Sequence, residues 1–267
     1  MIGRWHESGP TRAGDDLRAL DGVDRRIRSL AMSFGAREVQ YPVLISREAL
    51  ERAEYQLAFP HLLMSVCHPA SSDPGQPTGC EALGADNRGA WCLSPAVCYH
   101  TYAQFAGQEL DAPTVVTARG RCFRAERETT PGVRQIEFEM RELVCLGPAD
   151  RIETFANAAQ SAVEMMAIEM GLHGRWQTAE DPFFLPATSG KALLQRLLKL
   201  KVEYQWPGPG GLALASVNRH GTFFGQRFNI TTPDGRPVHS ACVAVGLDRW
   251  AHHAQRSDQG DDKETRR

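Results

Sequence analysis

The sequence lacks any long apolar run, and it lacks an excess of positive charge. No stretch approaches the roughly 20 apolar residues that a membrane-spanning helix needs, and the opening residues MIGRWHESGPTRAGDD contain no apolar signal segment. The 30 lysines and arginines are balanced by 32 acidic residues, for a formal charge of -2. A general nucleic-acid or membrane surface normally shows as a basic excess. We therefore expect a cytoplasmic protein with no membrane partner, in which a few placed residues meet any anionic ligand.

Lysine and paired cysteines are also scarce. Arginine carries most of the positive charge, since the only lysines are Lys191, Lys199, Lys201 and Lys263. Arginine suits bidentate recognition of phosphate or carboxylate, but a compositional bias of the genome explains the same count. The seven cysteines form no C-x-x-C pair and are odd in number, which argues against a zinc ribbon or a disulfide framework. We expect most of them to be buried thiols, although the fold can still bring one or two together as metal ligands.

The remaining sequence predicts one α+β domain built on an antiparallel sheet flanked by helices. Apolar residues recur at helical spacing over 15–36, 151–170 and 187–201, and Ser46 is the expected N-cap of a further helix. Strands are predicted near 39–41, 91–93, 121–127, 135–146, 211–218, 225–230 and 238–246. No repeat or internal linker appears, so a single domain over residues 1–254 is expected, followed by a disordered polar tail over 255–267.

Charged residues interrupt the predicted hairpin GRCFRAERETTPGVRQIEFEMRELVCLG, residues 120–147. Alternation places Arg124 and Glu126 on one face of the first strand, and Arg134 and Glu142 on one face of the second. An unpaired buried charge costs several kcal/mol, so Glu142 needs a cation, a metal or a proton. Alternation alone leaves open a structural salt bridge with a neighbouring arginine, or a shift in the strand register.

Read as a pattern, three segments resemble the motifs of class II aminoacyl-tRNA synthetases, in the family's order. Residues 35–45 (GAREVQYPVLI) resemble motif 1, FRAE with the following loop and Arg134 resembles motif 2, and ACVAVGLDRW at 241–250 resembles motif 3. The resemblance implies the class II catalytic fold and a homodimer with Pro42 at its interface.

The same resemblance implies roles for individual residues. Arg124 would hold the α-phosphate of ATP and act, with Arg249, as a catalytic residue, while Arg134 and Arg249 would hold the γ-phosphate. Glu126 would meet the adenine side, and Gln135 and Ser216 would complete the nucleotide contacts. Ser216 and Asn218 would also face the aminoacyl group. The family's usual magnesium-binding glutamate is absent, since Leu212 and Ala213 stand there. Mg²⁺ must then arrive mainly with ATP, or a different carboxylate must help.

Further segments, including LSPAVCYHTY, FEMRELVCLG, LALASVNRHGTFFGQRFNI and HSACVAVGLDRW, resemble the amino acid:[carrier protein] ligases. That family is similar to the catalytic domain of atypical zinc-dependent seryl-tRNA synthetases. The resemblance, over about residues 15–253, implies activation of glycine or alanine with ATP and transfer to the phosphopantetheine thiol of an acyl or peptidyl carrier protein. It also implies one Zn²⁺ per subunit on Cys98, Glu142 and Cys242, holding the substrate amine. Three ligands with an open fourth position suit a substrate-binding zinc.

Two other functions remain open at this point. Aminoacylation of tRNA ranks lower, because the chain shows no coiled coil or anticodon-binding module and its charge is slightly negative, so no stable tRNA binding is expected. A catalytically silent, nucleotide-binding regulatory paralogue is the other alternative. The identity of the amino acid cannot be read from the sequence.

Overall fold

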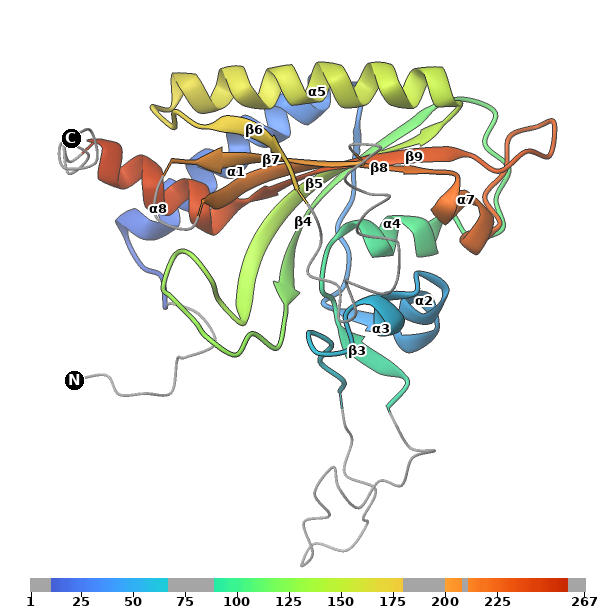
Figure 1. The fold of residues 1–267 in the computed structure, drawn as a ribbon, viewed down its shortest axis with the longest axis horizontal. Helices are drawn as coiled ribbons and strands as arrows, with labels where there is room; N and C mark the ends of the chain where they lie inside the picture. Colours follow the sequence, from blue (N-terminus) through green and yellow to red (C-terminus); the bar gives the residue numbers. More distant parts are fainter. Residues whose placement is uncertain (1–10, 67–88, 180–199, 208–210, 259–267) are drawn as a thin grey trace, which may run out of the picture.

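A computed structural model describes residues 11–66, 89–179, 200–207 and 211–258. A seven-stranded, mostly antiparallel sheet forms its centre, in the order β1-β4-β5-β9-β8-β7-β6 (Figure 1). The strands are β1 (Arg37–Glu38), β4 (Thr114–Phe123), β5 (Glu137–Gly147), β6 (Arg175–Thr178), β7 (Lys201–Trp206), β8 (Leu212–Gly221) and β9 (His239–Gly246). Among the described strands of this sheet, β1 alone pairs in parallel, with β4.

Three long helices cover one face of this sheet. They are α1 (Asp15–Ser33), α5 (Ala149–Glu169) and α8 (Leu247–Asp258). In α1 the buried residues Leu20, Val23, Ile27 and Ala31 recur at helical spacing, so the apolar stripe lies toward the sheet. The main core therefore lies between these helices and the side chains that β5, β8 and β9 direct toward them. Within the described residues no helix is both long and apolar enough to span a bilayer.

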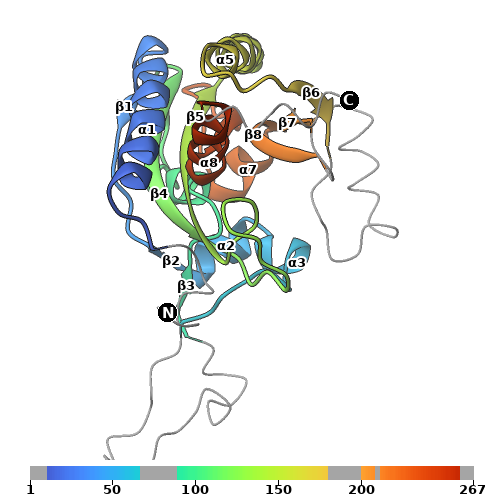
Figure 2. The ribbon, with the colours of Figure 1, turned by 90° about the vertical axis from the view of Figure 1, so that its left-hand side faces the viewer.

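The other face carries shorter elements. These are α4 (Cys98–Gln104), α7 (Phe223–Phe228), α2 (Arg47–Arg52), α3 (Tyr55–Ala58) and a separate two-stranded sheet of β2 (Leu44–Ser46) and β3 (Trp91–Leu93). In both views α2 and α3 lie on the side of the sheet away from α5 (Figures 1 and 2). Ser46 caps α2 as its sequence predicts, because its hydroxyl accepts a hydrogen bond from the Ala49 amide at 3.2 Å. A second core forms here, around Tyr102, Phe224 and Phe228.

The structure corrects several sequence predictions. The first hairpin strand, predicted over 121–127, is β4 and begins at Thr114, because Arg119 and Arg121 hid the pattern. Residues 225–230, predicted as a strand, are largely helical in α7, where they complete an aromatic cluster with α4. The helix α8 continues past Gln255 to Asp258, beyond the predicted start of the disordered tail; residues 259–267 lie outside the described part.

The predicted helix over 187–201 also needs correction at its end. Lys201 begins strand β7, which pairs with both β6 and β8. Val202, Tyr204 and Trp206 pack against the main core, so period-two alternation overrides the helical pattern read from the preceding leucines. The rest of that segment, like Cys67 and Cys80, falls outside the described residues.

Candidate active site

Strand register places four predicted site residues on the sheet face opposite α1 and α5: Glu142, Ser216, Asn218 and Cys242. Residues paired across neighbouring strands lie side by side, with their side chains on the same face. Two adjacent rows result, Glu203–Ser216–Ala244–Glu142 and Lys201–Asn218–Cys242–Val144, running from β7 through β8 and β9 to β5. On this face the central strand β9 carries Cys242, Ala244 and Gly246 in that order, so its side chains become smaller along the strand. These small side chains leave a hollow above the sheet.

Cys98, Glu142 and Cys242 meet at one end of this hollow. Their ligand atoms lie within 4.8 Å of one another, and all three residues are buried. Glu142 accepts a hydrogen bond from the Val97 amide at 2.8 Å through Oε1, while its Oε2 has no hydrogen-bond partner among the described residues. No ion pair of the described residues includes Glu142, so the structural salt bridge that alternation left open is not formed. A buried carboxylate with one unsatisfied oxygen beside two thiols offers three donor atoms to a cation.

The electrostatics of this triad are tightly coupled. Burial raises the pKa of Glu142 to about 8, and the adjacent Cys242 adds to the shift. The pKa of Cys242 lies well below its ordinary value, mainly because Cys98 donates a hydrogen bond to it, with His220 and Asn218 contributing. The pKa of Cys98 is raised for the converse reason. Thiolate and carboxylate ligands are the donors that Zn²⁺ accepts in proteins, so these three residues fit a zinc ion.

Asn218 bridges the triad and the next row of the sheet. Its Nδ2 donates to the Cys242 Sγ at 3.5 Å and to the Ser216 Oγ at 3.1 Å. It therefore orients one proposed ligand from outside the triad. Contacts of this kind normally fix the position of a ligand and raise metal affinity.

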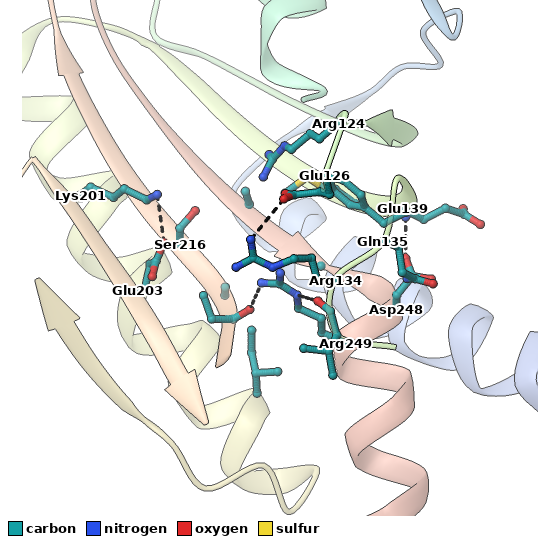
Figure 3. A pocket seen from close by; sticks show the side chains of 18 residues that line it. Arg124, Glu126, Arg134, Gln135, Glu139, Lys201, Glu203, Ser216, Asp248 and Arg249 are labelled. Atoms are coloured by element: carbon teal, nitrogen blue, oxygen red, sulfur yellow. Dashed lines mark hydrogen bonds and ion pairs between the residues drawn. The ribbon is translucent and has the colours of Figure 1, made fainter. Parts of the chain in front are cut away.

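Three arginines surround the other end of the hollow, which we call the arginine pocket (Figure 3). Arg124 follows the end of β4; its Nε donates to the Pro95 carbonyl at 3.2 Å and its guanidinium lies 5.0 Å from the centre of the Phe138 ring. Arg134 donates to Glu126 Oε2 at 3.2 Å. Planar guanidinium groups clustered around a hollow form a site for a polyanion such as a triphosphate.

Arg249, near the start of α8, connects the hairpin loop to the sheet. Its Nε donates to the Val133 carbonyl at 2.8 Å and its Nη1 donates to the Ala213 carbonyl at 2.6 Å. Burial, assisted by the charge of Arg124, lowers its pKa to about 10. A guanidinium has five N–H groups, so these two bonds set its plane and leave donors for an anion.

The turn of the hairpin is held against α8 by a second contact. Thr130 and Arg134 exchange backbone hydrogen bonds at 2.7 and 2.8 Å. Between them Gly132 adopts φ +72°, and a Cβ there would lie 2.6 Å from the His252 ring. Only glycine fits both the left-handed backbone and this close approach. The loop that carries Arg134 is therefore positioned by the same helix that carries Arg249.

The structure brings nearly all the predicted site residues to one continuous hollow. The three arginines, Glu126, Ser216, Asn218 and the triad line the same cavity, and Gln135 lines its adjoining part. Gln135 is 6% exposed, and its Oε1 has no hydrogen-bond partner among the described residues. Leu212 and Ala213 supply no carboxylate; instead the Ala213 carbonyl holds Arg249.

Two pocket residues were missed by sequence reasoning. Lys201 and Glu203 project from β7 into the hollow, where the Lys201 Nζ lies 3.0 Å from the Glu203 Oε1 (Figure 3). The signal was the alternation in KVEYQW, where Val202, Tyr204 and Trp206 occupy one parity and the charged residues occupy the other. The helical spacing of the preceding leucines extends the predicted helix to Lys201 and obscures this alternation.

Comparisons with known proteins show which family the chain resembles. No family model matches the chain. Amino acid--[acyl-carrier-protein] ligase 2 of Bradyrhizobium diazoefficiens is 33% identical over 226 residues, which cover 80% of this chain and 67% of that protein. Ligase 1 of the same organism is 31% identical over 265 residues, covering 92% of this chain and 80% of that protein.

Solved structures establish the fold independently. The chain matches M. kandleri seryl-tRNA synthetase (SerRS), solved in complex with A. aeolicus tRNASec, with a TM-score of 0.73 at 22% identity. The match covers 94% of this chain but 54% of that one, so this chain spans about half of it. At this identity the likeness shows the fold alone, which is that of class II aminoacyl-tRNA synthetases, as the sequence motifs predicted. With two relatives above 30% identity over most of both chains, the protein belongs to the amino acid--[acyl-carrier-protein] ligase family.

Proposed function

We propose that this protein activates a small amino acid with ATP and transfers it to the phosphopantetheine thiol of a carrier protein. The observation that carries the proposal is a single hollow with a cluster of arginines at one end and the Cys98–Glu142–Cys242 triad at the other. An aminoacyl-adenylate has matching ends, because its phosphate is anionic and its amine is a metal ligand. The family membership supports the same activity.

In the first step an oxygen of the substrate carboxylate attacks the α-phosphorus of ATP. The bond from that phosphorus to the bridging oxygen breaks, and pyrophosphate leaves with the electron pair. Arg124 holds the α-phosphate, Arg134 and Arg249 hold the γ-phosphate, and Glu126 and Gln135 meet the nucleotide. No protein base is required, because the carboxylate is already ionised and catalysis comes from positioning and charge stabilisation. Mg²⁺ enters with ATP.

The triad serves the amino acid. A zinc ion on Cys98, Glu142 and Cys242, when bound, supplies an open coordination position for the substrate amine. Asn218 keeps Cys242 in place, and Ser216 faces the aminoacyl end of the hollow. In the second step the carrier thiol sulfur attacks the carbonyl carbon, the bond to the AMP oxygen breaks, and AMP and the thiol proton are released.

Glycine or alanine is the proposed substrate. The fully buried Tyr102 stacks on Phe224 with ring centroids 3.9 Å apart, and both belong to the core packed against the triad. Phe224 lines the hollow that contains the triad, so we expect this rigid stacked pair to disfavour a long substrate side chain. A densely packed wall resists expansion, since an added methylene in a filled core costs about 1–3 kcal/mol.

The test is pyrophosphate exchange screened over all amino acids, with and without a chelator. Glycine or alanine should support exchange, and zinc removal should abolish it. Transfer of labelled amino acid to a phosphopantetheinylated carrier, and not to tRNA, completes the assignment. Labelling of tRNA alone would replace it with a synthetase function, whereas absence of exchange with zinc present would point to a nucleotide-binding regulator.

We further propose that the protein is a homodimer joined near Pro42 and the β2–β3 sheet. Val43, Leu44 and Trp91 on this small sheet are 40%, 38% and 50% exposed, which is high for large apolar side chains. Leu44→Asp should convert the dimer to a monomer in light scattering. Leu57→Asp, at an apolar residue of α3 that is 76% exposed, is the matched control and should remain dimeric.

A further inference from the structure

We propose that Glu203 of β7 binds the ribose hydroxyls of the nucleotide, with Lys201 holding its carboxylate in place. The inference deepens the proposed function, because it assigns a recognition element of the ATP site to a strand on which neither the motifs nor the family resemblance places a residue. The inference rests on two observations: the residues that pair across the strands, and the residues that line the pocket.

Register places Glu203 at the end of the row that starts at the triad. The row is Glu142, Ala244, Ser216 and Glu203, on four neighbouring strands. Neighbouring strands lie about 4.8 Å apart, so the row spans roughly 14 Å. Ala244 and Ser216 are small, which leaves the floor between the two glutamates open. A nucleotide joined to an amino acid anchored at Glu142 would lie along this floor.

Three other carboxylates line the arginine pocket, and each of them already has a partner. Glu126 is bound by Arg134, and Glu139 projects toward the opposite face, where Arg119 donates to it at 2.7 Å. Asp248 accepts from the Glu139 amide and pairs with Arg12. Glu203 alone of these four lies directly across a strand pair from Ser216. Leu212 and Ala213, earlier on the same strand as Ser216, have no polar side chain with which to contact a sugar.

The charge pattern identifies the part of the ligand that Glu203 can face. A carboxylate repels phosphates, which belong near Arg124, Arg134 and Arg249. Hydroxyl groups donate to carboxylates, and acidic residues recognise ribose hydroxyls in dinucleotide sites. The Lys201 and Glu203 side chains are only 12% and 18% exposed. An ion pair so far from solvent costs desolvation, which is offset when its remaining lone pairs are also satisfied.

The experiment compares ATP with 2′,3′-dideoxy-ATP in wild type, Glu203→Ala and the isosteric Glu203→Gln. Wild type should have a KM for ATP about tenfold below that for the dideoxy nucleotide, the effect of one hydrogen bond to a charged group. Glu203→Ala should raise the KM for ATP about tenfold and leave that for the dideoxy nucleotide unchanged. Glu203→Gln, which keeps one acceptor oxygen, should fall between them. Dissociation constants from titration calorimetry should follow the same pattern.

Glu153→Ala is the control, because Glu153 also pairs with a cation, Arg219 at 3.1 Å, but its side chain is 58% exposed and lies outside the hollow. It should behave as wild type. If Glu203→Ala raises the KM for ATP and for the dideoxy nucleotide by the same factor, the inference is overturned and the Lys201–Glu203 ion pair is structural. A raised Mg²⁺ requirement with unchanged discrimination would overturn it in favour of a metal contact. If wild type shows no exchange, the proposed function fails, and calorimetry with the two nucleotides still decides the role of Glu203.

Discussion

Arg141 and Glu142 are neighbours in β5, are 3% and 1% exposed, and point to opposite faces of the sheet. Arg141 is fully matched: it donates to both oxygens of Asp24 at 2.6 and 3.0 Å and to Glu38 at 3.1 Å. Within the described part of the chain, Glu142 has one backbone donor and one oxygen without a hydrogen-bond partner, beside two thiols. Burial and strand position are the same for both, so only the set of partners distinguishes a structural charge from a ligand.

The largest effect should come from removing Arg141, the buried charge whose partners are all in place. Arg141→Ala leaves Asp24 and Glu38 close together without their cation, so the free energy of unfolding should fall by about 3–5 kcal/mol. Chemical denaturation measures it. The control is Arg121→Ala, in which an exposed pair with Glu137 at 2.9 Å is lost. Exposed ion pairs contribute less than about 1 kcal/mol. An equal fall in the free energy of unfolding of the two variants would contradict the structural role of Arg141.

Substitution of a proposed zinc ligand should lower the metal content of the protein and leave its stability unchanged. Glu142→Gln and Cys98→Ala each remove one of three proposed ligands, so bound zinc after dialysis should fall from about one per subunit to near zero. Elemental analysis of the purified protein measures this directly. Circular dichroism should remain that of the wild type, because Glu142 contributes no ion pair to the described part of the fold. Zinc retained in both variants would refute the site. Exchange activity that survives Cys98→Ala would refute the anchoring role.

A smaller effect is expected from the residue that orients Cys242. Asn218→Ala removes the donor 3.5 Å from its Sγ but leaves all three ligands. Loss of a residue that hydrogen-bonds to a metal ligand typically weakens metal affinity by about 10–100-fold. A competing chelator should therefore remove zinc from this variant at a correspondingly lower concentration. Affinity equal to that of wild type would show that the contact does not support the ligand.

The smallest change tests the hairpin turn. Gly132→Ala places a Cβ 2.6 Å from the His252 ring at a positive φ, which costs on the order of 1–2 kcal/mol. The strain should displace Arg134, so the KM for ATP should rise several-fold while zinc content stays unchanged. The double variant with His252→Ala removes the clash and should recover part of the affinity. If it recovers none, the contact does not position the loop.

Prediction from sequence succeeded where local pattern and motif agree. Helical spacing located α1 and α5, the hydroxyl of Ser46 marked the start of α2, and small residues marked β9. It failed where a strand interior carries charge, as at Arg119 and Arg121 in β4. It also failed at β7, where Lys201 and Glu203 followed a leucine-rich segment with helical spacing. At β7 the helical spacing of the preceding residues obscured the alternation of KVEYQW, and in both cases pairing with the neighbouring strands decided the outcome.

The sequence by itself determined the class of fold, and its resemblance to a known family supplied the residues assigned to the proposed chemistry, because the family's motifs can be read directly in the chain. Only the tertiary structure decided which of those side chains meet. Cys98, Glu142 and Cys242 come from a helix and two strands far apart in the chain, and packing of α4 beneath β5 and β9 brings them within 4.8 Å. The same pairing brought Glu203 opposite Ser216. Proximity across strands depends on register, and register is a property of the folded sheet.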